Sequence, residues 1–295
     1  MARRVFVLGA SLVIYLVVVV FFVATLRSLA RSGTEGFVLG PRVAVVELEG
    51  VITDTGDLIR DLRRHRENPL VKAVVIRINS PGGVVAPTQE LHTALQRVRE
   101  AGKPVVASLG AVAASGGYYV AVAADRIYAN PGTLTGSIGV IMQLANLESL
   151  FKKVGVEWVV VKAGQFKDIG NIARPMTAEE RRVLQALLDD VHGQFIAAVV
   201  DGRKLDRTEV KTIADGRIFS GAQAKANRMV DELGGFEDAI NGAAMLAGLP
   251  APPAVIMPRR RLSISELLRN GVGLPGLAML RPELPSFKTP LYLMD

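Results

Sequence analysis

The chain has 295 residues, of which 49% are hydrophobic, and its formal net charge is +7. It contains no cysteine, which excludes disulfide bonds, thiolate catalysis and zinc–cysteine sites. Aromatic residues make up only 5% of the chain, so the stacking platforms that bind single-stranded nucleic acid are missing. We therefore expect no nucleic-acid partner, and we interpret the positive charge as a solvated surface that faces membrane lipid.

The chain begins with a stub at residues 1–4, followed by an uncharged apolar run of 22 residues at positions 5–26. Because roughly 20 apolar residues cross the hydrocarbon core of a bilayer, this run predicts a single transmembrane anchor. A cleaved signal peptide is the alternative, since Ser28-Leu29-Ala30 resembles a cleavage site. The short stub favours an N-terminus inside the cell and a catalytic domain outside the cytoplasm, although arginines flank both ends of the run.

After a linker at residues 27–41, strand and helix patterns alternate up to residue 248. We expect buried strands that begin at Arg42, Lys72, Pro104, Asp125 and Glu157. We expect helices at residues 57–66, 87–100, 147–154 and 177–200, and a short helix from Ser115. This alternation is typical of the α/β class, in which crossover helices join parallel strands around one core.

The helix expected at residues 177–200 starts with a capping box made by Thr177 and Glu180. Beyond residue 248 the composition changes, because eight of the fifteen prolines lie in the last 46 residues. Residues 249–295 are therefore expected to form an irregular tail rather than a second domain.

Three glycine-rich turns follow strands of the predicted core, at residues 79–83, 113–118 and 135–139. Ligand sites of parallel α/β sheets lie beyond the carboxyl ends of the strands. Glycine there lets backbone amides approach a substrate, and two such amides can form an oxyanion hole for acyl transfer. Ordinary loops also use glycine, so no single turn identifies a site.

Ser115 is the strongest candidate nucleophile, because it lies between two alanines and two glycines where a strand passes into a helix. Free amides at a helix start stabilise negative charge that develops there. The alternative is that Ser115 only caps the short helix with its hydroxyl.

A nucleophilic serine needs a base, and the three histidines are poor candidates. His65 lies in a charged string, and His92 and His192 are expected within helices away from the glycine turns. Lysine is the other common base, provided that burial lowers its pKa enough to keep it neutral. Lys162 and Lys167 lie near a suitable loop, and spacing alone does not choose between them.

The segments INSPGG, AASGGYYVAVAADRIYANPGTLTGSIGV and AGQFKDIG resemble, in order and spacing, the signature segments of the bacterial signal peptide peptidases. The resemblance covers roughly Val43 to Gly248 and corresponds to the short form with a single core. It implies the parallel-sheet fold shared by Clp proteases and crotonases, here as a domain at residues 42–248.

The resemblance also implies a role for each site residue. Ser115 matches the nucleophile, and Lys167, rather than Lys162, matches the general base. Ser137 matches the serine that holds the lysine amine, while Gly83 and Gly116 match the oxyanion donors. No cofactor and no metal is implied.

The implied activity is that of a membrane-bound serine endopeptidase that degrades released signal peptides. Some relatives carry two copies of the core, with the serine in one copy and the lysine in the other. This chain has one copy, so the resemblance predicts a homo-oligomeric ring, of eight subunits, with each site shared between neighbours. Two rival hypotheses are a crotonase-type enzyme acting on acyl-CoA thioesters and a protease-like scaffold without activity.

Overall fold

The computed structural model of the chain describes residues 15, 19, 22, 40–258 and 291–293. The chain divides into two units, Met1–Gly40 and Pro41–Asp295, and the second unit contains the sheets. The predicted anchor at residues 5–26 lies outside the described residues, apart from Tyr15, Val19 and Phe22, which are helical and exposed.

Eight strands form one sheet, in which hydrogen-bonded neighbours follow the order β7-β6-β4-β2-β1-β9. β5 branches from β4 and pairs with β8, and within the described part of this sheet only β6 and β7 run antiparallel. The strands are β1 (Arg42–Glu49), β2 (Val71–Ser80), β4 (Val105–Ala114), β5 (Arg126–Ala129), β6 (Leu134–Gly136), β7 (Ile218–Ser220), β8 (Glu232–Leu233) and β9 (Ala254–Ile256). The predicted α/β class with a parallel sheet core is confirmed.

Helices cover the two faces of this sheet because successive strand residues point to opposite sides. Ala44, Val46 and Leu48 of β1 belong to the larger core cluster, with apolar residues of the helices α2, α3, α4 and α6. Val43 and Val45 face the smaller cluster, which α9 completes. These helices are α2 (Gly56–Glu67), α3 (Val85–Glu100), α4 (Gly116–Ala121), α6 (Ala178–Arg203) and α9 (Phe236–Leu246).

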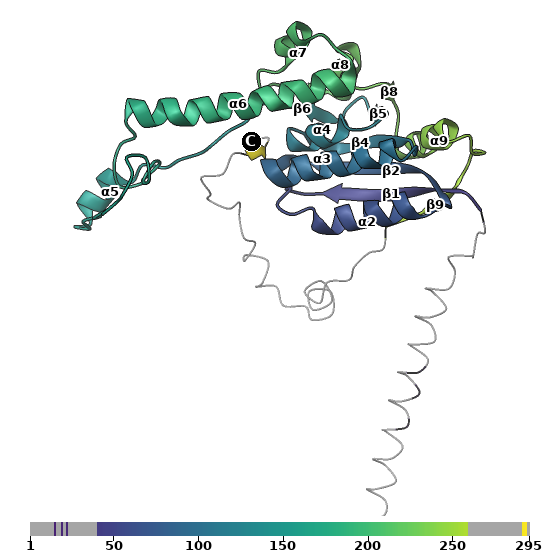
Figure 1. Cartoon of the computed structure of the whole chain (residues 1–295), viewed down its shortest axis with the longest axis horizontal. Helices are drawn as coiled ribbons and strands as arrows, with labels where there is room; N and C mark the ends of the chain where they lie inside the picture. The colour runs from purple at the N-terminus through teal and green to yellow at the C-terminus, as the bar shows by residue number, and fades with distance from the viewer. Residues whose placement is uncertain (1–14, 16–18, 20–21, 23–39, 259–290, 294–295) are drawn as a thin grey trace, which may run out of the picture. The chain divides into compact units, whose positions relative to one another are not determined.

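The long helix α6 starts as predicted, with a complete capping box between Thr177 and Glu180. Figure 1 shows α6 running past the core, with α5 (Glu148–Lys153) near its far end. By length and composition, α6 is the one described helix that could span a membrane. Its C-terminal half buries Phe195 and Val199 in the core, so we interpret it as a helix of the folded domain.

One predicted strand is wrong. Residues 157–164 form neither strand nor helix, although their valines favour strands. All of them are exposed, and Val161 is 96% exposed. A strand requires a hydrogen-bonded neighbour, and none of the strands in the described part of the chain pairs with this segment. The other predicted strands and helices are confirmed to within a few residues, except that β4 extends beyond its predicted end.

Several short elements have no counterpart in the sequence prediction. They are β3 (Gly82–Val84), β6, α7 (Arg207–Ile213), β7, α8 (Gly221–Ala226), β8, α9, β9 and β10 (Leu291–Leu293). β9 lies beyond the predicted end of the domain at residue 248 and pairs in parallel with β1. β10 forms a separate two-stranded sheet with β3. The region predicted as an irregular tail therefore contributes a strand to each sheet.

Candidate active site

Ser115 occupies the junction between β4 and α4. Its backbone has φ 53° and ψ −118°, outside the regions that a residue with a side chain normally adopts. Strain of this kind costs on the order of 1–3 kcal/mol and is concentrated at functional sites. The Ser115 amide donates to the carbonyl of Gly136 at 2.7 Å, which fixes the junction against β6.

The hydroxyl of Ser115 makes no hydrogen bond within the described residues. It makes no capping hydrogen bond, although Ser115 holds the N-cap position of α4. Its Oγ is buried and has no hydrogen-bond partner among the described residues. A buried polar atom normally has a partner, so this atom requires an explanation. The capping role considered from the sequence does not provide one.

The two glycines predicted as oxyanion donors lie close to each other at this junction. Gly116 follows Ser115 and begins α4, where first-turn amides lack an acceptor within the helix. A Cβ placed on Gly116 would lie 3.2 Å from the Gly83 nitrogen and 3.2 Å from the Cα of Gly82. The first two glycine-rich turns are therefore in contact, and the two predicted oxyanion donors lie close together.

Gly83 must be glycine because β3 packs directly on Ile52. A Cβ at Gly83 would lie only 2.1 Å from the carbonyl oxygen of Ile52. Ile52 donates to the carbonyl of Gly82 at 2.8 Å and accepts from the amide of Val84 at 2.7 Å. Because neighbouring strand residues direct their polar groups to opposite edges, those of Gly83 face away from Ile52.

Ser137 follows β6 and lies next to Gly136, which accepts the hydrogen bond from the Ser115 amide. It also has a positive φ, of 51°, and is buried. Ser137 lines an open cavity of about 750 Å³ together with Gly139, Leu188 and His192. Because Ala114 pairs with Gly136 in parallel strands, Ser137 lies next to Ser115 at the carboxyl ends of β6 and β4.

One prediction about the histidines is wrong. His192 does lie in a helix, but it borders the cavity of Ser137 and the third glycine-rich turn. Its Nε2 is buried without a hydrogen-bond partner in the described part of the chain. Helix α6 crosses over the sheet and brings His192 to this turn, which separation along the sequence did not indicate.

The other two histidines belong to the structure of the domain. His92 packs against the ring of Tyr119 with ring centroids 5.0 Å apart, and burial lowers its pKa to about 4. His65 lies in the last turn of α2, and burial lowers its pKa also. Neither one lines the cavity of Ser137.

The two candidate lysines differ in their contacts. The amine of Lys162 donates to the Gln165 carbonyl at 2.9 Å and forms an ion pair with Asp168. The hydrogen bond that Lys162 donates to the Asp168 carboxylate is the main reason why the pKa of this carboxyl is lowered, to about 2. Lys167 is exposed, and within the described residues its amine has neither an ion-pair nor a hydrogen-bond partner.

The loop of Lys167 is attached to the outer end of α6. Gln165 donates to Glu179 at 3.0 Å, and Arg174 pairs with Asp168 and with Glu180 in the first turn of the helix. The opposite half of α6 contacts α4, where the rings of Phe195 and Tyr119 are 5.1 Å apart.

Phe195 lies fifteen positions after Glu180 in α6, which corresponds to about 22 Å along the helix axis. Figure 1 likewise shows the chain around α5 beyond the outer end of α6, away from α4. Within one chain the structure therefore brings Ser115, Ser137, Gly83 and Gly116 together, but it does not bring Lys167 to them.

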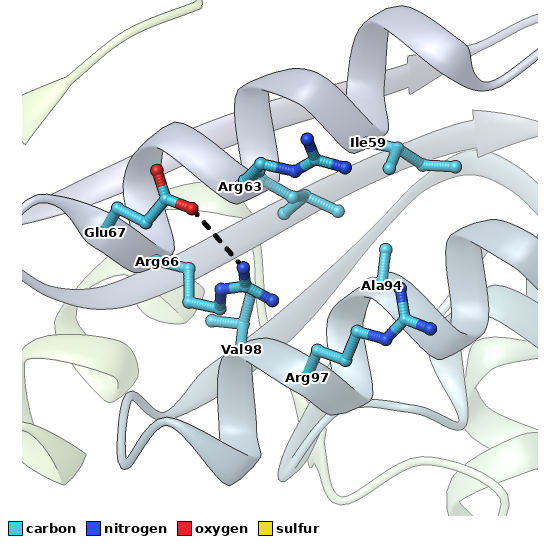
Figure 2. Close-up of a pocket in the computed structure, with 8 residues that line it drawn as sticks. Ile59, Arg63, Arg66, Glu67, Ala94, Arg97 and Val98 are labelled. Carbon is cyan, nitrogen blue, oxygen red and sulfur yellow. Dashed lines mark hydrogen bonds and ion pairs between the residues drawn. The ribbon is translucent and has the colours of Figure 1, made fainter.

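A separate pocket of about 270 Å³ lies between α2 and α3. Figure 2 shows Arg63, Arg66 and Arg97 around it, with Arg66 paired to Glu67. None of the predicted site residues lines this pocket. In the described part of the chain, no cluster of three or more histidine, cysteine or acidic side chains is arranged to hold a metal ion.

Comparison with known proteins gives this site a context. Residues 97–250 match the model of peptidase family S49. A protein of Synechocystis sp. named "Putative protease slr0021" is 46% identical over 70% of this chain and 75% of its own length. Protease 4 of Salmonella typhi is 38% identical over 71% of this chain. "Putative signal peptide peptidase SppA" of Enterococcus faecium is 33% identical over 68% of it.

The matched region spans 35% of the Salmonella protein and 62% of the Enterococcus protein. These matches place the chain in the class of serine-type peptidases, and the structure agrees with them in carrying a strained, buried serine at the carboxyl end of a parallel strand. Within that class, the chain belongs to peptidase family S49.

Proposed function

We propose that the protein is a membrane-bound endopeptidase that cleaves peptide bonds with a Ser115–Lys167 dyad. The observation that carries this proposal is Ser115, whose backbone is strained and whose buried hydroxyl has no hydrogen-bond partner among the described residues, next to the turn where Gly116 meets Gly83. A serine that capped a helix would use its hydroxyl in a hydrogen bond, and a serine that only filled space would not require a strained backbone.

Lys167 is a better candidate for the base than Lys162. The amine of Lys162 is already committed to Asp168 and to a backbone carbonyl within its own loop. The amine of Lys167 is free of such contacts among the described residues, and the resemblance to signal peptide peptidases selects the same lysine. Transfer of a lysine into an apolar cavity lowers its pKa and produces the neutral amine that a base requires.

In the proposed reaction the Lys167 amine accepts the Oγ proton of Ser115, and Oγ attacks the peptide carbonyl carbon. Amides of Gly83 and Gly116 donate hydrogen bonds to the oxyanion of the tetrahedral intermediate. The lysinium then protonates the leaving amine as the carbon–nitrogen bond breaks. Water hydrolyses the acyl-enzyme ester with the same lysine as base, and Ser137 holds the lysine amine throughout.

The lysine is proposed to come from a neighbouring copy of the chain. The arm at residues 147–164 supports this, because Leu150, Val154, Trp158 and Val161 are each at least half exposed. Clustered apolar side chains of this kind mark protein contact surfaces. A contact that passes an arm from each subunit to the next is head-to-tail and can close into a ring.

The proposed substrates are signal peptides released into the membrane, by analogy with the name of the Enterococcus relative. A single anchor at residues 5–26 would hold the catalytic domain near them, on the extracytoplasmic side. Full-length protein should sediment with membranes, whereas a chain that starts at Ser28 should not. Protease added to spheroplasts should digest the catalytic domain, and protection from digestion would reverse this topology.

Mixing inactive chains tests the shared dyad. Ser115→Ala and Lys167→Ala chains should each be inactive alone on a fluorogenic peptide. When they are co-assembled, some interfaces pair an intact serine with an intact lysine, and a fraction of the activity should return. The control mixes Ser115→Ala with Ser115→Ala/Lys167→Ala chains, which contain no intact serine. Absence of recovery in oligomers shown to be mixed would place both residues in one subunit.

A further inference from the structure

The pocket between α2 and α3 is lined by a cluster of arginines. Its volume is about 270 Å³, and its charged lining residues are Arg63, Arg66 and Glu67 of α2 and Arg97 of α3. Figure 2 shows the arginine side chains extending from the two helices into the space between them. None of these residues takes part in the proposed peptidase mechanism, so that mechanism leaves the pocket unexplained.

The positive charge of this pocket is not balanced within the described part of the chain. Glu67 is the one carboxylate among its lining residues, and it pairs with Arg66 at 3.4 Å. The guanidinium groups of Arg63 and Arg97 have neither an ion-pair nor a hydrogen-bond partner among the described residues. Three guanidinium groups and one carboxylate leave a net charge of +2. Like charges around one cavity repel each other, and a bound anion removes this repulsion.

The ends of the two helices offer another explanation for the arginines, because a helix C-terminus attracts cations. Arg66 and Arg97 do lie in the last turns of α2 and α3. However, the amine of Lys103 already donates to the carbonyls of His65 at 2.8 Å and Asn68 at 2.7 Å, at the end of α2. Backbone amides of the following turn donate to the last carbonyls of α3. Other groups therefore satisfy the helix ends, and the guanidinium groups stay available for a ligand.

The rest of the pocket is apolar. Leu62 and Val98 are each 1% exposed, and Ile59 and Ala94 complete the lining. An inorganic ion would leave this apolar surface without a contact. An organic anion can place its charge on the arginines and its carbon atoms against the apolar side chains.

We propose that this pocket binds the phosphate group of an organic phosphate, with Arg63, Arg66 and Arg97 as its ligands. A guanidinium group presents a planar fork of donors that matches two phosphate oxygens. A phosphate has enough oxygens to accept from several guanidinium groups at once, whereas a carboxylate has only two. The site is separate from the proposed dyad, so neither proposal depends on the other.

Two sources can supply such a phosphate group, a lipid headgroup or a soluble phosphate ester. The amide of Arg42 donates to the carbonyl of Leu70 at 2.8 Å, so the chain enters the domain beside the end of α2. The linker at residues 27–41 joins this point to the predicted anchor. A linker of that length spans at most about 50 Å, which keeps the pocket within reach of a membrane surface around the anchor.

Titration with glycerol 3-phosphate tests the pocket directly. The melting temperature of the full-length protein in detergent should rise by roughly 2–4 °C at concentrations several times above Kd. Sodium chloride at the same ionic strength should not produce this shift. An equal shift with chloride would reduce the effect to screening and overturn the proposal.

A matched pair of variants on α2 tests the assignment of the ligands. Arg63→Gln should raise the Kd for glycerol 3-phosphate, measured by calorimetry, by about tenfold, because it removes a charge-assisted hydrogen bond. Arg64→Gln makes the same change in charge at the next position, which does not line the pocket and pairs with Asp61 at 2.9 Å. It should leave Kd nearly unchanged. Equal weakening by both variants would show an effect of net charge alone and contradict the pocket.

Nanodiscs distinguish the two sources of phosphate. The full-length protein is reconstituted in discs of phosphatidylcholine with and without phosphatidylglycerol. If a lipid headgroup occupies the pocket, phosphatidylglycerol should raise the melting temperature of the unmodified protein and of Arg64→Gln, but not that of Arg63→Gln. Equal melting temperatures in both discs, with binding of glycerol 3-phosphate retained, would assign the pocket to a soluble phosphate ester. Absence of both effects would overturn the proposal.

Discussion

The core around Ser115 and the arm at residues 147–164, which precedes the loop of Lys167, contain similarly apolar sequence but differ in how far other elements cover them. In the core, the strands β1, β2 and β4 bury most of their side chains, and Val74, Ile76 and Val106 are fully inaccessible. In the arm, Val159 is 74% exposed and Val161 is 96% exposed. Helices of the same chain cover the sheet, but none of the described elements covers these apolar side chains of the arm.

This difference separates the part of the molecule that its own chain buries from the part that it leaves exposed. In the core, strands and helices of the same chain pair the backbone and bury the apolar side chains. They hold Ser115 next to Ser137 and Gly116 next to Gly83. Among the described residues, charged and polar side chains attach the lysine loop to the first turn of α6. The proposed catalytic centre is divided between these regions and would need a second chain, and each prediction below tests one side of that division.

The largest effect is expected on the core side. Ser115→Ala should lower kcat/KM by about 10³-fold or more, because removal of a nucleophile eliminates covalent catalysis. It should leave the melting temperature nearly unchanged, since the hydroxyl has no partner among the described residues. Peptide turnover and thermal unfolding measure the two outcomes, with Ser149→Ala in α5 as the control. A folded Ser115→Ala protein that still turns over peptide would remove Ser115 from the mechanism.

On the arm side, Lys167→Ala should lower kcat/KM by about 10²–10⁴-fold, the usual contribution of a general base. Lys167→Arg should be equally impaired, because arginine stays protonated near neutral pH. Lys162→Ala is the matched control in the same loop and should retain most of the activity. Should Lys162→Ala prove the inactive variant instead, the base would be assigned to the wrong lysine.

The arm surface should matter for assembly rather than for folding. Val161→Asp places a charge where we expect a neighbouring subunit, and burial of an unpaired charge is strongly unfavourable. The oligomer should dissociate at a higher protein concentration than the unmodified protein does, and activity should fall by about tenfold. The melting temperature of the core should stay constant. Analytical ultracentrifugation gives the oligomer size. Leu70→Asp, at a 41% exposed position before β2, is the control, and an equal effect of both changes would argue against the arm as the interface.

The smallest effect concerns the ion pairs that hold the lysine loop. The pKa of Asp168 and that of Glu180 are each lowered to about 2, mainly by Lys162 and by Arg174 respectively. Because a depressed carboxyl pKa stabilises the folded loop above the ordinary value of about 4, this stabilisation is lost as the pH falls from about 4 to about 2. Carboxyl chemical shifts followed by NMR should give midpoints near 2. Midpoints near 4 would mean that these ion pairs do not form in solution.

Most of the core could be predicted because its determinants are local. Apolar runs predicted β1, β2, β4 and β5, and the capping box of Thr177 and Glu180 placed the start of α6. The glycine context of Ser115 indicated a special junction, which the structure shows as a positive φ. The contact between the turns of Gly83 and Gly116 needed the three-dimensional arrangement, since nothing in their separation along the chain predicts it.

The remaining errors arose where a partner in space decides the outcome. The valines at 159–161 have high strand propensity, but propensity does not provide a pairing edge. His192 is predicted to lie away from the glycine turns, but its position within a helix does not reveal which elements that helix packs against. The strands β9 and β10 lie in proline-rich sequence, where the signals for a loop outweigh the few residues that pair.

In the proposed catalytic centre, the length of α6 sets the distance between the core and the lysine loop. Its 26 residues set how far the lysine loop projects from the core. Each inserted residue would move that loop by about 1.5 Å and rotate it by about 100° around the helix axis, and four residues would restore the orientation approximately at a shift of about 6 Å. Insertions and deletions in α6 should therefore affect function with the period of the helix, even at solvent-facing positions where substitutions have little consequence.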